Sequence, residues 1–202
     1  MNSSTEPIQT ELVLVGGGHA NIQVLKSFGM RPIAGLRVSL ISDVINAPYS
    51  GMLPGFVAGE YSYDKMHINL VQLANFANAR FIKTNITSID TINRQIHCEG
   101  RPAISYDLIS VNTGITPDFG DIKGAREHCI AVKPISHFLS HLPNLDATVT
   151  TPTDVIAIIG SGAAGIELAF AFRARFNQKK IKPKIILIGS AERLFPTLPK
   201  KC

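Results

Sequence analysis

The sequence predicts an α/β fold built on parallel strands, and three observations support this prediction. Short apolar runs rich in β-branched residues recur along the chain, which is typical of strands buried on both faces of a parallel sheet. Two of these runs end in glycine-rich turns, and each turn is followed by a helix-forming segment and another apolar run. The first glycines of the two turns, Gly16 and Gly160, are 144 positions apart in the 202-residue chain, which indicates that one βαβ unit is present twice. The runs are Leu12–Val15, Leu36–Ile41, Ala79–Ile82, Leu108–Val111, Val155–Ile159 and Ile185–Ile188.

The first unit begins with Leu12–Val15, which leads into Gly16–Gly18 and then into a helix predicted from about His19 to Phe28. A helix N-terminus preceded by glycines offers free N–H groups and close backbone approach, which is what a diphosphate requires. Asn21 stands where the third glycine of a GxGxxG motif would be. The first unit is therefore a dinucleotide-site candidate with an incomplete motif.

The second unit carries the complete motif. Gly160, Gly162 and Gly165 follow the run Val155–Ile159 and open a helix predicted over Ala163–Phe176. Gly160 would form the tight turn, Gly162 would admit the pyrophosphate, and Gly165 would allow close packing of helix on strand. In this strand–helix context the motif predicts a second dinucleotide site.

An acidic residue near the end of the second strand normally binds the ribose of the dinucleotide. In the first unit Ser42 occupies that place and Asp43 follows it, so Asp43 is the candidate. In the second unit Gly189 occupies it, with Glu192 and Arg193 close behind. An arginine would favour a 2′-phosphate and a glutamate a 2′-hydroxyl, so the choice between NADPH and NADH stays open.

The segment between the two units is predicted to begin with a loop. Pro48–Gly55 is rich in glycine and proline, which argues against a helix or a central strand. A helix around Leu70–Asn78 and a hairpin of Ile86–Ile89 and Arg94–Cys98 are expected next, and Pro117–Gly124 is the expected domain junction.

Two dinucleotide sites in one chain indicate electron transfer, because a nicotinamide commonly gives hydride to a flavin held by a neighbouring unit. The segment Tyr106–Gly114, with Pro117, resembles the YDxLxxATGxxP segment of the pyridine nucleotide-disulfide oxidoreductase superfamily, with Asn112 in place of the usual alanine. Gly160–Glu167 resembles the GxGxxGxE motif of the same flavoproteins.

Within that superfamily the chain is most similar to type II NADH dehydrogenase-like proteins and to the flavoprotein module fused ahead of selenide, water dikinase. Gly16–Ala20, Phe28–Pro32 and Pro48–Gly55 carry this likeness. The resemblance implies a Rossmann-like FAD/NAD(P)-binding fold, with the first part of an FAD-binding domain over residues 10–118 and an incomplete NAD(P)-binding domain over residues 119–202.

The resemblance also implies which residues hold the cofactors, FAD and NAD(P)H. It assigns no catalytic side chain, because such proteins mainly position the two rings. His19 is expected either near the FAD diphosphate or in plain helix packing, and Glu167 in a structural or inter-domain contact. The FAD residues are Gly16, Gly17, Gly18, His19, Ala20, Asp43, Pro48, Tyr49, Thr113 and Gly114, and the NAD(P)H residues are Gly160, Gly162, Ala163, Ala164, Gly165 and Glu167.

Composition excludes several other classes. With 45% hydrophobic and 17% charged residues, the chain is neither disordered nor a coiled coil. The net charge of +5 comes from residues 173–202, which hold nine Lys or Arg and one acid, so a solvated face or an anion-binding surface is expected and nucleic acid is not. No signal peptide, transmembrane run or metal-ligand pattern is visible, and a cytoplasmic protein is expected.

The three cysteines, Cys98, Cys129 and Cys202, are too scattered to form the redox pair of a disulfide reductase, so Cys98 and Cys129 are expected to be buried apolar residues. The expected activity is hydride transfer from the nicotinamide to the flavin and then to a small acceptor such as a quinone. The alternatives are a non-catalytic or regulatory module of a selenide, water dikinase fusion, or an inactive fragment.

The family's return segment to the FAD domain and its C-terminal domain have no counterpart before Cys202, so the C-terminal portion of a longer protein is an expected partner. Weak FAD retention and low NAD(P)H oxidation are expected of this chain by itself.

Overall fold

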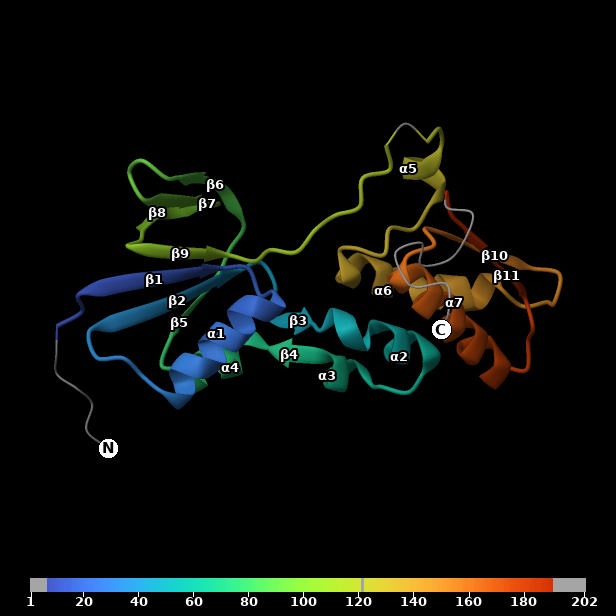
Figure 1. Cartoon of the computed structure of the whole chain (residues 1–202), viewed down its shortest axis with the longest axis horizontal. Helices are drawn as coiled ribbons and strands as arrows, with labels where there is room; N and C mark the ends of the chain where they lie inside the picture. The colour runs from blue at the N-terminus through green and yellow to red at the C-terminus, as the bar shows by residue number, and fades with distance from the viewer. Residues whose placement is uncertain (1–6, 121, 191–202) are drawn as a thin grey trace, which may run out of the picture. The chain divides into compact units, whose positions relative to one another are not determined.

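The computed structural model describes residues 7–120 and 122–190, which divide into two units (Figure 1). Unit 1 comprises the chain up to Ala47 together with His67–Ile115, and unit 2 comprises Pro48–Met66 and the chain from Thr116 onwards. The expected boundary between residues 118 and 119 lies close to this division. Residues 48–66, which we placed in the first domain, cluster with unit 2.

Unit 1 is built on a parallel sheet of four strands in the order β5–β2–β1–β9. Val15 at the end of β1 pairs with Ile41 in β2 and with Val111 in β9, so the carboxyl ends of three strands meet at one edge. This arrangement confirms the predicted α/β, Rossmann-like fold. The strands are β1 (Thr10–Val15), β2 (Leu36–Ser42), β5 (Arg80–Lys83) and β9 (Leu108–Val111).

Two helices, α1 (His19–Met30) and α4 (Leu70–Phe76), cover one face of this sheet (Figure 1). Successive strand residues point to opposite faces, so Leu14 packs towards the helices with Leu25 and Leu70.

An antiparallel sheet covers the other face, where Val13, Val15 and Ile41 pack against Ile96 and Ile104 (Figure 1). Its first two strands are the predicted hairpin, whereas the third was not predicted. The three are β6 (Ile86–Asp90), β7 (Gln95–Cys98) and β8 (Arg101–Ser105).

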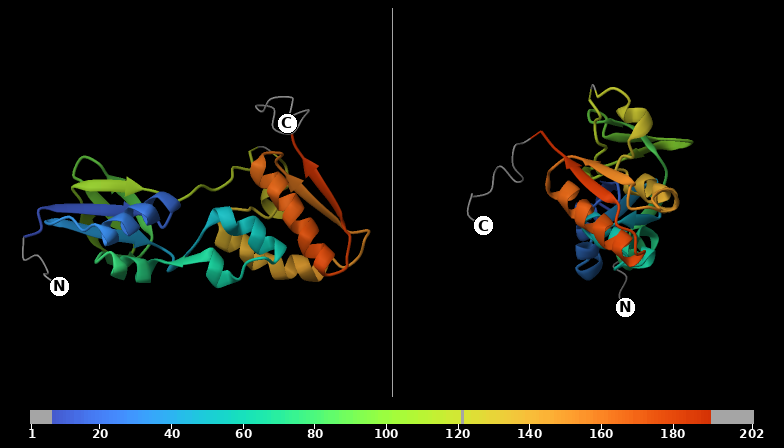
Figure 2. Two further views of the ribbon diagram at one scale, coloured as in Figure 1. Left: turned by 60° about the horizontal axis from the view of Figure 1, so that its bottom comes forward. Right: turned by 90° about the vertical axis from the view of Figure 1, so that its right-hand side faces the viewer.

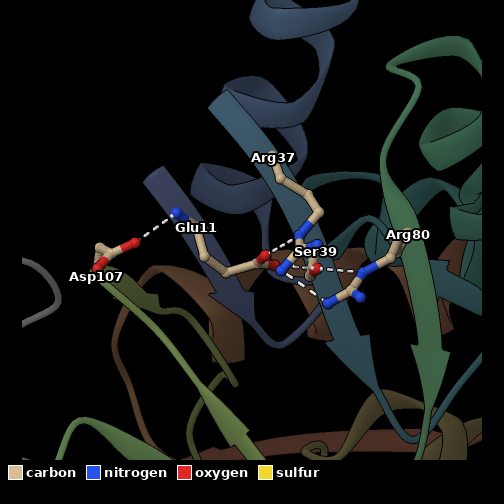
Figure 3. Close-up of polar contacts among 5 residues, drawn as sticks. All are labelled: Glu11, Arg37, Ser39, Arg80 and Asp107. Atoms are coloured by element: carbon tan, nitrogen blue, oxygen red, sulfur yellow. Dashed lines mark hydrogen bonds and ion pairs between the residues drawn. The ribbon is translucent and has the colours of Figure 1, made fainter. Parts of the chain in front are cut away.

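A polar network lies towards the amino ends of the parallel strands (Figure 3). Glu11 is only 7% exposed, and its carboxylate accepts hydrogen bonds from Arg37, from Ser39 at 2.5 Å and from Arg80 at 3.2 Å. The Glu11 N–H donates to the carboxylate of Asp107 at 2.7 Å. The network thus ties β1, β2, β5 and the approach to β9 together at the end opposite to the glycine turn.

Unit 2 has an apolar core to which a two-stranded parallel sheet and several helices contribute. Figure 2 shows the ribbons of these elements. Phe138, Phe172 and Phe176 are the largest buried side chains of the core, and Val57 and Ile156 join them. The elements are β10 (Val155–Ile159), β11 (Lys184–Ile188), α2 (Leu53–Ala58), α6 (Ile135–Thr148) and α7 (Ala163–Gln178), with η1 (Ser50–Met52), α3 (Tyr63–Met66) and α5 (Ala125–His128) as short helices. The short strands β3 (Asn46–Pro48) and β4 (His67–Asn69) pair with each other.

The prediction that every apolar run is buried on both faces is wrong for the strands outside the centre of the first sheet. Val155 and Ile159 in β10 are 53% and 58% exposed, and Leu108 and Val111 in β9 are 57% and 56% exposed. β9 is exposed because it lies at the edge of its sheet. In β10, Ile156 packs into the unit 2 core, whereas its two neighbours in the strand are exposed, so only one face of this strand is buried.

The prediction of a loop over Pro48–Gly55 is also wrong in its second half, because α2 begins at Leu53. Pro54 lies in the first turn, where the backbone N–H has no partner within the helix and proline is tolerated. Burial of Leu53 and Val57 in the unit 2 core compensates for the poor helix propensity of the segment. Helix α6, which contains Pro143, was likewise not predicted.

Candidate functional site

The first glycine turn, Gly16–Gly18, connects β1 to α1. Gly16 has φ of +88°, its N–H donates to Ile41 O at 2.8 Å, and a methyl group on it would lie 2.5 Å from Asn112 O. Ile22 N–H donates to Gly18 O at 3.1 Å, which starts the helical hydrogen bonding. Only glycine fits at Gly16, because both the backbone conformation and the neighbouring strand exclude a side chain.

Asn21 replaces the third glycine by making polar contacts of its own. It is fully buried, and its Nδ2 donates to Val15 O and Gly16 O, each at 2.9 Å. Ser110 Oγ donates to Asn21 Oδ1 at 2.7 Å. The carboxamide therefore joins α1 to the ends of β1 and β9, where a glycine would allow direct contact. The sequence had marked Asn21 only as a departure from the motif.

Asn112, directly after β9, lies against the first glycine turn. Its backbone O accepts a hydrogen bond from Gly18 N–H at 3.0 Å, and its side-chain Oδ1 accepts one from Ala20 N–H at 3.0 Å. Thr113 follows, with its Cα against Gly16, and Gly114 has φ of +87°. Of the predicted FAD residues, the turn glycines, Ala20 and Thr113 thus come together at one edge of the sheet.

The other predicted FAD residues lie around this edge or in unit 2. His19 is an exposed first residue of α1, and Asp43 is exposed directly after β2, next to the buried Ser42. Pro48 and Tyr49 belong to unit 2, where Tyr49 N–H donates to Met66 O at 2.8 Å. Their contact with a flavin stays a prediction.

The second glycine turn, Gly160–Gly162, connects β10 to α7 with the same hydrogen bonds. Gly160 has φ of +113° and its N–H donates to Ile188 O at 2.7 Å, while Ile166 N–H donates to Gly162 O at 3.1 Å. A methyl group on Gly165 would collide with Gly160 O, so this glycine allows helix and turn to touch, as the motif predicts. 

The backbone of the second glycine turn is open. Among the described residues, no atom lies within 4 Å of a methyl group placed on Gly160 or Gly162, and no side chain caps the first residues of α7. Ala163 and Ala164 are exposed in the first helical turn, and Glu167 is exposed further along. A phosphate could therefore reach the amide end of α7 without displacing any described side chain, so these residues fit a dinucleotide.

The cysteines lie outside both turns. Cys98 and Cys129 are half-buried, in contrast to the full burial that we expected, and burial raises the pKa of the Cys98 thiol. Cys202 and the specificity candidates Glu192 and Arg193 lie outside the described residues.

Two further features of the described ranges, 7–120 and 122–190, concern metals and membranes. His137 and His141 face each other with Nε2 atoms 3.3 Å apart on α6, but these ranges contain no group of three metal-ligating side chains. Nor do they contain a helix of the length and apolar character needed to cross a bilayer.

Comparison with known proteins agrees with this geometry. Residues 10–202 match the family model described as pyridine nucleotide-disulphide oxidoreductase. The chain belongs to this family. The family assignment confirms the predicted superfamily, and FAD and NAD(P)H, the predicted cofactors, are those of the family.

One curated relative is the NADH dehydrogenase-like protein YutJ of Bacillus subtilis, which is 27% identical over 192 residues. The match covers 91% of this chain and 52% of the relative, so the chain spans about half the length of that protein.

Solved structures share the fold. The sulfide:quinone oxidoreductase of Aquifex aeolicus superposes with a TM-score of 0.75 at 22% identity, covering 92% of this chain and 44% of that one. NDH2 from Plasmodium falciparum in complex with NADH gives a TM-score of 0.73 at 18% identity, covering 95% and 44%. Both are similar to the present chain across the two units.

Proposed function

We propose that this chain is an FAD-dependent NAD(P)H oxidoreductase of the NADH dehydrogenase-like kind, with FAD at the first glycine turn and NAD(P)H at the second. The observation that carries the proposal is the repetition of one hydrogen-bonded turn. Gly16 and Gly160 donate to the end of the neighbouring strand, and Ile22 and Ile166 donate to the carbonyl groups of Gly18 and Gly162. A chain with two such turns is suited to hold two dinucleotides at once.

In unit 1, the turn amides and the N-terminus of α1 would bind the FAD diphosphate. Thr113 and Gly114 would border it after β9, and Asp43 would accept hydrogen bonds from the ribose. Pro48 and Tyr49 would lie near the flavin ring. His19 would stand at the helix end, where its ring can contact the diphosphate.

In unit 2, the open amides from Gly162 to Ala164 would bind the nicotinamide dinucleotide at the N-terminus of α7. Gly160 and Gly165 would maintain the turn, and Glu167 would make a contact beyond it. When both cofactors are bound, the nicotinamide supplies a hydride that the flavin accepts, and the two electrons pass to a small acceptor such as a quinone. The chain's own residues bind and orient, and none is assigned an acid or base role.

The test is to purify the chain beside a longer version that matches the length of its curated relative, and to record flavin absorbance anaerobically before and after adding NADH or NADPH. Bound flavin that bleaches with either nucleotide is the expected result for the longer version, and weaker flavin retention with little bleaching is expected for the chain itself. Flavin that stays oxidised would instead favour a non-catalytic module, such as one serving a selenide, water dikinase. Absence of flavin from both versions would contradict the proposal.

Gly162→Val is the matched variant. A side chain at Gly162 would meet none of the described atoms within 4 Å, and the φ of −74° suits any residue, so the variant is expected to fold while its side chain fills the phosphate position. It should retain flavin and lose bleaching. Bleaching at the original nucleotide concentration would exclude the second glycine turn as the nicotinamide site.

A further inference from the structure

We propose that the Asn112 carboxamide occupies part of the diphosphate position at the first glycine turn and thereby sets the affinity of this chain for FAD. This inference rests on the function proposed above. It concerns the side chain of Asn112, at a position where the family pattern has alanine. We assign this side chain an effect on FAD binding in addition to its place in the loop after β9.

The contacts of Asn112 are those that a phosphate oxygen would make. Oδ1 accepts from Ala20 N–H in the first turn of α1, at 3.0 Å, where the helix dipole favours a negatively polarised atom. A methyl group on Gly18 would collide with this same oxygen, so Oδ1 lies directly against the turn glycine whose missing side chain should admit the ligand. The carboxamide oxygen therefore stands where a diphosphate oxygen is expected.

The contact is also one that a ligand can displace. The hydrogen bond from Ala20 to Asn112 is exposed, whereas the hydrogen bonds of Asn21 to Val15 and Gly16 are buried in the same turn. Moving the Asn112 side chain would leave no cavity in the apolar core, whereas moving the Asn21 side chain would leave buried carbonyl groups without hydrogen-bond donors. FAD would thus compete with Asn112 and not with Asn21, which would keep the turn in place.

The second glycine turn has no such side chain among the described residues. A methyl group on Gly162, the counterpart of Gly18, meets nothing within 4 Å. The side chain at the diphosphate position is thus a difference between the two turns that mutation can remove, and the nicotinamide site supplies an internal control for the FAD site.

The size of the effect follows from the hydrogen bond that the ligand must break. A net hydrogen bond of ordinary strength corresponds to about a threefold to tenfold change in an equilibrium constant. Removing the carboxamide should therefore tighten FAD binding by about that factor.

The experiment is titration of FAD into the wild-type chain and into Asn112→Ala, followed by quenching of flavin fluorescence, with NADH and riboflavin titrated in parallel. The dissociation constant of FAD is expected to fall about threefold to tenfold in the variant. That of NADH, at unit 2, should not change, and neither should that of riboflavin, which lacks a diphosphate. The ligand-free variant should melt at a lower temperature, because α1 loses a capping contact.

A second variant, Asn112→Asp, keeps the acceptor and adds a charge. It should melt no lower than wild type and bind FAD more weakly, because the carboxylate repels the diphosphate. Unchanged or weaker FAD binding by Asn112→Ala would overturn the inference. If the alanine variant does not fold, Asn112→Asp decides instead, and unchanged or tighter FAD binding by that variant would overturn the inference. If wild type and both variants bind no FAD at all, the proposed function itself fails, which is a different outcome.

Discussion

The two glycine turns share their hydrogen bonds and differ in what surrounds them. In each, the first glycine donates to a residue near the end of the neighbouring strand, and the helical hydrogen bonds start at Gly18 or Gly162. In unit 1, Asn112 and Thr113 lie against Gly16 and Gly18, whereas no described atom lies within 4 Å of a methyl group on Gly160 or Gly162. The conformation of the turn is thus encoded locally, and its enclosure comes from a third strand distant in sequence.

The two units also differ at the amino ends of their first strands, β1 and β10. Glu11 in β1 is buried among Arg37, Ser39 and Arg80 (Figure 3). Val155, 144 positions later in β10, is 53% exposed. Unit 1 therefore has polar anchoring at both ends of its first strand, and unit 2 depends on the apolar core beneath its sheet. This difference can be tested by mutation.

Replacing the first glycine of each turn should give the largest difference between the units. Gly16→Ala combines a positive φ with a methyl group 2.5 Å from Asn112 O, and should lower the free energy of unfolding by more than about 3 kcal/mol. Gly160→Ala carries only the backbone strain, about 1–3 kcal/mol. Urea unfolding followed by circular dichroism measures both. Equal losses would show that β9 does not restrict the first turn.

Asn21→Leu tests the polar replacement of the third glycine. The variant keeps the side-chain volume but leaves Val15 O, Gly16 O and Ser110 Oγ without their buried partner, which should cost about 2–3 kcal/mol of unfolding free energy. Gln23→Leu, at an exposed position of the same helix, is the control and should change little. If both variants unfold at the same urea concentration, the Asn21 carboxamide does not stabilise the turn.

Glu11→Gln tests the network at the opposite edge. Two guanidinium groups would lose their anion, and because Arg37 and Arg80 are half-exposed the loss should be about 1–2 kcal/mol, below that of a fully buried pair. Asp43→Asn, which removes an exposed acid from the same unit, is the stability control. A melting temperature of Glu11→Gln that matches this control would mean that the network contributes nothing measurable.

The smallest effect on stability is expected from Asp146, which lies in unit 2. Burial by itself would raise the pKa of Asp146, but hydrogen bonds and charge from Arg175 and Lys179 outweigh it and lower the pKa below its ordinary value of 3.8. Its contribution to stability is therefore complete above the ordinary pKa and is lost as the pH falls through the lowered one. Unfolding free energy measured from pH 6 to pH 2 should fall less steeply in Asp146→Asn than in wild type. Parallel curves would exclude this ion pair as a source of acid sensitivity.

The parts of the fold that local sequence encodes could be predicted. β9 and β10 begin and end at the predicted residues, and α7 begins at Ala163 as predicted, because glycine turns and β-branched runs specify their structure locally. Helix α2 could not be predicted: its Pro54 and Gly55 argue against a helix, and its stability comes from packing with distant parts of unit 2.

In the candidate site, the sequence predicted the glycines of the two turns but not the side chains that surround them. Asn21 and Asn112 were visible as departures from the two motifs. Their contacts depend on β9 lying beside β1, a pairing across about a hundred residues that no local pattern specifies. The sequence therefore predicted where the two glycine turns lie and left open which side chains surround them.

The hydrogen bond from each first turn glycine to the neighbouring strand has an evolutionary consequence. Because Gly16 bonds to Ile41 and Gly160 to Ile188, each βαβ block of about thirty residues contains the strand that its own turn bonds to. A gene duplication that copied such a block would copy this contact with it. The residues that differ between the two blocks lie within them, as Asn21 and Gly165 do, and elsewhere in the chain, as Ser110 and Asn112 do, so divergence at both would fit the blocks to different ligands.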